Sequence, residues 1–316
     1  RKEVRSGPFE GVSDDELDAL LEKYIEAARL AFAIGFDFID LKQCHRYLLC
    51  ELLSARSRPG RYGGSFENRT RFIRTLVERL RGEFPNKLLA TRLNVYDGVP
   101  FEKGSDSDQG VPSPWEPPVD SCWGVSSNDP SRADLAEPLR LVGELKRLGI
   151  SLLNVTLGNP YANPHFGRPF EYAPVDGYLP PEHPLIGVDR HFRLTETIQR
   201  AFPDLAVVGT GYSWLQTFAM QAGAANLRGG RVSIVGMGRA ALSNPDFARQ
   251  VMEGRPLDPK RTCRTFSYCT ALMRSKHNEL GQYPTGCPPF DKDAYDPIWK
   301  EARGAATSSV AERSTM

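Results

Sequence analysis

Long apolar runs, a strong net charge and regularly spaced cysteines are all missing from this sequence. No apolar stretch approaches the roughly 18 residues that a membrane-spanning helix needs, so none is expected. Lysine and arginine total 40 against 39 acidic residues, and the resulting net charge of +1 gives no indication of a nucleic acid or membrane partner. Three of the six cysteines, Cys263, Cys269 and Cys287, have intervals too irregular for a zinc site or an iron–sulfur cluster. We therefore expect no metal.

A signal peptide is also not visible, and the sequence opens on Arg1 rather than on methionine. This beginning suggests a fragment or a processed product. The length of 316 residues is enough for one large α/β domain with a sizeable core.

Strand and helix patterns alternate along the chain and predict an α/β fold. Ser13 and Glu16 form a capping box that opens the first helix, and Ser65 is positioned to cap a later one. We also predict a helix over 190–201 and another that Asn244 caps, with Pro245 in its first turn. Five strands, each followed by a helix, are predicted near residues 36–41, 88–93, 151–157, 205–209 and 232–235.

The segment 97–134 differs from its surroundings because Pro, Gly, Ser and Asp dominate it. A connection of this length without periodicity is either a functional loop or a disordered one.

The first predicted strand is the one around which the candidate site is organised. It begins at Phe36, and Lys42, His45 and Tyr47 follow within six residues of its predicted end at Leu41. Polar side chains at the carboxyl end of a buried strand are typical of the active site of a (β/α)₈ barrel.

Two sequence blocks here resemble the old yellow enzyme family of FMN-dependent NAD(P)H oxidoreductases. The family has a strand pattern [VI]-[DE]-I-H-x-A-[HN]-G-Y-L, followed about fifteen residues later by E-Y-G-G-S-x-E-N-R-x-R-F. The corresponding stretches here are Ile39-Asp-Leu-Lys-Gln-Cys-His-Arg-Tyr-Leu48 and Arg61-Tyr-Gly-Gly-Ser-Phe-Glu-Asn-Arg-Thr-Arg-Phe72. The second block matches almost letter for letter. In the first, Lys42 replaces a histidine and Arg46 replaces a glycine.

The resemblance implies a (β/α)₈ TIM barrel, of which the five strands correspond to strands four to eight. Strands one to three, which contact the flavin ring in the family, are then not among the strands we find. We expect residues 1–255 to form this partial FMN-binding barrel and 256–316 a C-terminal extension. A five-stranded part of a barrel has open sheet edges, so a second chain or a swapped copy is expected to complete it, and a homo-oligomer is one such arrangement.

The resemblance also implies roles for four residues of the first two strands. Tyr47 corresponds to the proton donor, and a phenol with a reference pKa near 10 suits that role at neutral pH. Lys42 and His45 correspond to the pair that binds the substrate's carbonyl oxygen, and Arg92 to a cation beside flavin N1 and O2. Three alternatives stay open: Tyr47 only packs, Lys42 turns away from the site, or Arg92 forms a buried ion pair with an acid.

At the ends of the last two strands, Gly209-Thr-Gly-Tyr212 and Gly236-Met-Gly-Arg239 match the family's FMN phosphate site. Barrels often bind phosphate at this place through backbone amides and one arginine. The cofactor-binding candidates are Gly209, Gly211, Tyr212, Gly238 and Arg239. Tyr161 and His165 either line the substrate side of the site or have structural roles.

These correspondences imply an enzyme that takes hydride from NAD(P)H onto FMN and passes it to an activated alkene such as an enone. An oxidative dehydrogenase or demethylase of the same family is one alternative, and a truncated, non-catalytic chain completed by a partner is another. Because the family is intracellular, we expect a cytoplasmic protein whose cysteines are reduced.

Overall fold

A computed structural model describes residues 11–172, 177–277, 279 and 281–314. Arg1 and part of the loop after residue 157 (173–176) lie outside the described residues. The chain divides into two compact units: unit 1 comprises Arg1–Asp97 and Glu116–Leu153, and unit 2 comprises Gly98–Trp115 and Asn154–Met316. The predicted division at residue 255 does not follow this boundary and stays a prediction.

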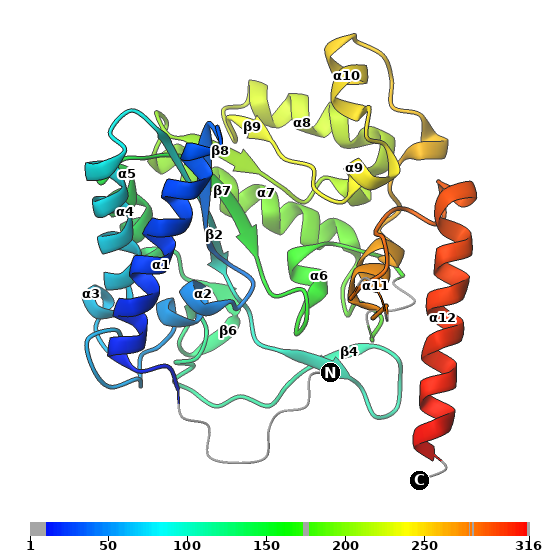
Figure 1. Cartoon of the computed structure of the whole chain (residues 1–316), viewed down its shortest axis with the longest axis horizontal. Helices are drawn as coiled ribbons and strands as arrows, with labels where there is room; N and C mark the ends of the chain where they lie inside the picture. Colours follow the sequence, from blue (N-terminus) through cyan, green and yellow to red (C-terminus); the bar gives the residue numbers. More distant parts are fainter. Residues whose placement is uncertain (1–10, 173–176, 278, 280, 315–316) are drawn as a thin grey trace. The chain divides into compact units, whose positions relative to one another are not determined.

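Unit 1 contains helices packed beside two parallel strands (Figure 1). Its helices are α1 (Asp14–Ala33), α2 (Leu48–Leu53), α3 (Phe66–Arg69), α4 (Arg71–Glu83) and α5 (Ala136–Arg147). Its strands are β1 (Phe38–Gln43), β2 (Leu88–Tyr96), β5 (Val125–Ser126), β6 (Asp129–Ala133) and the first half of β7 (Ile150–Leu157). The main strands follow the order β1-β2-β7, which leaves β1 at the edge of this unit.

The helix ends in unit 1 confirm two predictions from sequence. Ser13 Oγ accepts from the Glu16 amide while the Glu16 carboxylate accepts from the Ser13 amide, so the predicted capping box is formed. Ser65 caps α3 by accepting from the Asn68 amide. Helices α1 and α4 then pack together through apolar stripes at helical spacing. The stripe of α1 is Leu17, Leu21, Ile25 and Ala28, and that of α4 is Phe72, Ile73, Leu76, Val77 and Leu80.

The register of the first two strands determines which polar residues are neighbours. Strands β1 and β2 are parallel, with Lys42 opposite Arg92 and Gln43 opposite Leu93. The predicted strand end at Leu41 is wrong, because β1 runs on to Gln43 and includes Lys42. The ladder with β2 continues through these two residues, and Gln43 donates to Thr91 across it.

Unit 2 holds the remaining elements. Its strands are β3 (Phe101–Lys103), β4 (Gly110–Pro112), the second half of β7, β8 (Ala206–Gly209) and β9 (Ile234–Val235), the last three in this order. Its longer helices are α7 (Pro184–Ala201), α8 (Ala219–Arg228) and α12 (Lys292–Ser314). The short ones are α6 (Pro164–Gly167), η1 (Ser213–Phe218), α9 (Ala240–Ser243), α10 (Phe247–Met252), η2 (Pro259–Arg261) and α11 (Tyr268–Arg274).

Two predicted helix starts in unit 2 are wrong. Helix α7 begins at Pro184 rather than at residue 190, because His183 accepts from the Leu185 amide and proline suits the first turn. Asn244 does not cap α10. The residue before that helix is Asp246, and the side-chain amide of Asn244 instead donates to Gln250 Oε1.

The long segment 97–134 is shared between the units and contains four short strands. Strands β3 and β4 form an antiparallel pair in unit 2, and β5 pairs with β6 in unit 1. The backbone carbonyl of buried Trp123 accepts a hydrogen bond from the Asp97 amide. This bond connects the segment to the end of β2. The segment is therefore built into both units.

All five main strands predicted from sequence are present, and the pairs β1–β2 and β8–β9 are parallel. The α/β class is thus confirmed, while the eight-stranded barrel and its partial occupation by this chain stay predictions. Within the described residues, no helix combines the length and apolarity needed to cross a membrane.

Candidate functional site

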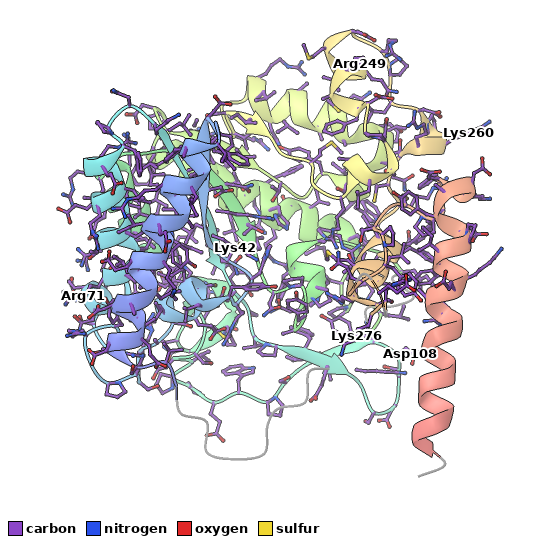
Figure 2. The ribbon with its side chains drawn as sticks, viewed as in Figure 1. Lys42, Arg71, Asp108, Arg249, Lys260 and Lys276 are labelled. Carbon is purple, nitrogen blue, oxygen red and sulfur yellow. The ribbon has the colours of Figure 1, made fainter. Side chains whose placement is uncertain are left out.

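The carboxyl end of β1 places Lys42 directly against Tyr47. Tyr47 follows the strand as the residue before α2, and its side chain is 47% exposed. The Lys42 ammonium lies 3.5 Å from the centroid of the Tyr47 ring. An ammonium over an aromatic face is attracted to it, by about 0.5–1 kcal/mol at an exposed site. Figure 2 shows Lys42 at this end of β1. Lys42 therefore lies against the ring of Tyr47, and its place in a substrate site stays a prediction.

His45 and Arg46 form the turn between β1 and Tyr47, and both have a left-handed backbone. Their φ angles are 61° and 55°. A left-handed backbone costs a residue with a side chain about 1–2 kcal/mol. This cost explains why the old yellow enzyme pattern has glycine at the position of Arg46. Here Arg46 pairs with Glu51 through two bonds, of 2.6 and 3.1 Å, and donates to the Ser121 carbonyl. These bonds offset the strain, and they direct the guanidinium toward Glu51.

Arg92 lies beside Lys42 on the neighbouring strand and has an unsatisfied donor. Its Nε is buried and has no hydrogen-bond partner in the part of the chain that is described. Within the same residues no carboxylate lies within ion-pair distance of Arg92, but Asp40 on β1 is close to it: burial raises the pKa of the Asp40 carboxyl, and the charge and the backbone amide of Arg92 lower it. A buried guanidinium N–H needs an acceptor. The residue thus fits the predicted contact with an electron-rich oxygen or nitrogen of a bound group.

Asp97, just after β2, is a site feature that we did not predict. Its carboxylate is buried and accepts from Asn94 Nδ2 at 2.6 Å, from the Trp123 amide at 3.0 Å and from Cys50 Sγ at 3.7 Å. Burial raises its pKa above the usual range, against the hydrogen bonds from Asn94 and Trp123, which lower it. Its position directly after a buried strand is the sequence feature that could have predicted it as a site residue. Asp97 joins β2, α2 and the segment after Ser121, and so supports the turn that carries Tyr47.

The second sequence block has a structural role through Arg69. This side chain is only 3% exposed and makes a bidentate pair with Glu137 of α5, at 2.6 and 3.2 Å. It also donates to the carbonyls of Gly64 and Leu53. The Arg69 guanidinium thus connects α3 and α5 with Leu53 and Gly64, which lie at the two ends of the loop between α2 and α3.

At the ends of β8 and β9, in unit 2, the predicted phosphate-binding glycines have two different reasons to be glycine. Gly211 has φ 95°, and a Cβ there would lie 2.8 Å from the His191 ring, whereas a Cβ on Gly209 would meet Val232 at 2.5 Å. Gly238 has open space around it instead. The amides of Gly211 and Gly238 donate to no group that the structure describes. Two available N–H groups at neighbouring strand ends fit an oxyanion.

The other two candidates at this end differ in what they can offer. The Tyr212 ring is buried against Phe192, and its hydroxyl accepts from Asn226 at 3.0 Å. Any contact of Tyr212 with a cofactor must therefore come from its backbone. Arg239 is half-buried and donates to Thr270 of α11 at 2.9 Å, which holds its guanidinium near the end of β9.

His165 and Tyr161, on the loop after β7, have separate environments. His165 is 2% exposed, lies among Phe101, Phe166 and Tyr178, and its Nδ1 is 2.8 Å from the Tyr178 hydroxyl. Burial lowers its pKa to about 4, so it is neutral at physiological pH. Tyr161 is exposed, with the Arg274 guanidinium 4.8 Å from its ring centroid. Only Tyr161 is accessible as a lining residue.

The six cysteines are all free thiols. Burial raises the pKa of Cys44, beside the site, to about 11, so this thiol is protonated and unreactive at neutral pH. Among the described residues, no group of three or more His, Cys, Asp or Glu side chains is arranged to hold a metal ion.

The part of the chain that contains the two sequence blocks is similar to known proteins. The model of the NADH:flavin oxidoreductase / NADH oxidase family matches residues 5–109. An NADH:flavin oxidoreductase of Gibberella zeae is 33% identical over 104 residues, which are 32% of this chain and 25% of that protein. An NADPH dehydrogenase of Geobacillus sp. (strain WCH70) is 27% identical over 232 residues, which are 73% of this chain and 52% of that protein.

Among solved structures, the old yellow enzyme homologue from Zymomonas mobilis is similar with a TM-score of 0.50 and 21% identity. The match covers 78% of this chain and 55% of that one, and at this identity it shows the fold alone. The chain spans from about a quarter to about half of the curated relatives described above. Residues 5–109, which carry both motif blocks and the Lys42–Tyr47 turn, thus match the model of the NADH:flavin oxidoreductase / NADH oxidase family, the family that the two blocks resemble.

Proposed function

We propose that this protein is an FMN-dependent NAD(P)H oxidoreductase that reduces an activated alkene of the enone type. The observation that carries the proposal is the end of β1, where an accessible phenol lies against an ammonium group. The first can give a proton and the second can stabilise a developing negative charge, which are the two tasks that alkene reduction leaves to the protein.

The residues present fit FMN. Each unit offers donors for one part of such a cofactor. In unit 1, Arg92 has a buried, unsatisfied N–H that suits a flavin ring. In unit 2, the Gly211 and Gly238 amides and Arg239 are donors that suit a phosphate. When bound, FMN accepts hydride from NAD(P)H and supplies it to the β-carbon of the substrate.

The protein's own residues then have separate tasks. Lys42 and His45 bind the carbonyl oxygen of the substrate, where negative charge accumulates as the β-carbon gains hydride. A positioned donor of this kind is worth about 2.7–4 kcal/mol of the barrier. Tyr47 transfers its hydroxyl proton to the α-carbon, and the ammonium against its ring stabilises the phenolate that remains. Solvent then returns the proton to the exposed phenol.

The test is whether the purified chain carries flavin and turns over. We expect visible flavin absorbance, and NAD(P)H consumption that depends on added 2-cyclohexenone. Mass analysis of every component in the sample identifies any second chain that contributes. A colourless sample that does not take up FMN would refute the proposal and favour a non-catalytic role.

Replacing Lys42 with histidine restores the family's usual residue. For the flavin-loaded protein we expect Lys42→His to bind phenol-type ligands more tightly, because an imidazole and His45 can share one phenolate oxygen. The measurement is the long-wavelength charge-transfer band during a titration with 4-hydroxybenzaldehyde. If the band does not strengthen, the ammonium already serves this oxygen as well as an imidazole.

We also propose that a second chain or a swapped copy covers the edge of unit 1. Strand β1 pairs only with β2 among the described strands, and several large apolar side chains near its start are exposed. They are Leu30, Ile34, Phe36, Phe38 and Leu88. An open parallel edge with an apolar border favours association.

Light scattering of the purified chain should therefore give a mass above that of a monomer. The double substitution Ile34→Glu with Phe36→Glu should reduce this mass, because two charges then border the edge. Met252→Glu, at an exposed apolar position of α10, is the control and should leave the mass unchanged. A monomer of the unchanged chain that unfolds cooperatively would contradict the proposal.

A further inference from the structure

A second candidate site lies on the outer side of unit 1, between α4 and the end of α5. It is a cavity of about 260 Å³ lined by Arg71, Arg74, Thr75, Glu78, Arg147 and Leu148. Four of these residues are on α4, at positions i, i+3, i+4 and i+7, and therefore share one face of that helix. Figure 2 shows Arg71 on this helical side, away from Lys42. None of the six belongs to the candidate flavin site.

The lining carries three positive charges and one negative charge, and the protein neutralises them incompletely. Arg71 donates to the Arg61 carbonyl and to Asn68 Oδ1, which are both uncharged acceptors. Arg147 has no hydrogen bond and no ion pair within the described residues. Arg74 forms an ion pair with Glu144 at 3.2 Å and donates to the Glu67 carbonyl at 3.0 Å, while its Nε has no hydrogen bond among the described residues. Two of the three arginines that line the cavity therefore have no carboxylate partner among the described residues, and the third, Arg74, is paired with Glu144.

The chemistry of the lining selects an oxyanion. Guanidinium groups bind phosphate through paired N–H donors, and the Thr75 hydroxyl adds one more donor. Glu78 and the carboxyl end of α5 oppose an anion, so its binding depends on the arginines. The volume is slightly below the roughly 300–1,000 Å³ of ordinary small-molecule sites, which limits the ligand to a small one. Leu148 provides an apolar wall for its carbon part.

We propose that this cavity binds a small phosphate monoester. The proposal is independent of the alkene-reductase function, because it uses different residues and needs no flavin. Three single substitutions of the full chain test it, with glycerol 3-phosphate as the probe and isothermal titration calorimetry at constant ionic strength as the measurement. Circular dichroism first establishes that each variant is folded.

We expect Arg147→Ala to weaken binding about tenfold, since one unpaired guanidinium is lost, which corresponds to about 1.4 kcal/mol. Glu78→Gln should tighten binding, because it removes the one carboxylate of the lining. Arg249→Ala on α10, which removes an exposed arginine from unit 2, is the matched control and should change nothing. Opposite shifts for Arg147→Ala and Glu78→Gln cannot arise from a general loss of structure.

Absence of binding at millimolar probe, or equal affinities in all four proteins, would overturn the proposal. Inorganic phosphate and glycerol serve as the partial ligands. If inorganic phosphate binds as tightly as the ester, the cavity recognises the oxyanion alone and the assignment to a monoester is wrong. Binding of glycerol as strong as that of the ester would refute the role of the arginines.

Discussion

Tyr47→Phe should slow the reoxidation of reduced flavin by 2-cyclohexenone by about 10²–10⁴-fold, the usual contribution of a positioned general acid. Reduction of the flavin by NAD(P)H should be nearly unchanged, because that half-reaction needs no proton at the substrate α-carbon. The ring itself remains, so its contact with Lys42 is kept. Stopped-flow measurement of the two half-reactions separates these effects.

The control for this prediction is Tyr24→Phe. Tyr24 packs edge-on against Phe72 between α1 and α4, and its loss of a hydroxyl should leave both half-reactions at their original rates. Equal slowing of both half-reactions in Tyr47→Phe would mean that the hydroxyl supports the fold of the turn. Proton transfer would then have to come from another group.

Arg69→Ala should lower the free energy of unfolding by about 3 kcal/mol. The substitution leaves Glu137 without its bidentate partner and leaves the carbonyls of Gly64 and Leu53 without their donor. Breaking a buried ion pair from one side costs about 3–5 kcal/mol, and we take the lower end because Arg56 also contacts Glu137. Each kcal/mol lowers the melting temperature by about 2–4 °C in domains of roughly 150–250 residues, and we expect a smaller shift in this longer chain.

Arg147→Ala removes the same side chain from an exposed position of the same unit, so it should shift stability by no more than about 0.5 kcal/mol. Thermal and urea unfolding of both variants, followed by circular dichroism, provide the comparison. Equal stability of Arg69→Ala and the unchanged chain would show that Arg69 of the second block does not hold α3, α5 and the glycine loop together.

The sequence alone determined the features that depend on neighbouring residues. The capping box at Ser13, the Ser65 cap and the apolar stripes of α1 and α4 follow from spacings of three and four residues, which local backbone geometry imposes. The five main strands followed from short apolar runs between helical segments. The fold class and the resemblance that the match of the family model to residues 5–109 supports were therefore accessible before any coordinates.

Only the tertiary structure decided how these elements use their polar residues. Strand pairing extended β1 through Lys42 and placed it beside Arg92, because the ladder with β2 continues past the last apolar residue. The pairing of Arg46 with Glu51 and the burial of Asp97 depend on contacts that strand periodicity does not encode. Tyr212 reads as a loop residue after a glycine, yet its ring fills the core, because Asn226 on α8 provides a partner for its hydroxyl. A side chain's neighbours across the fold decide whether it serves the site or the core.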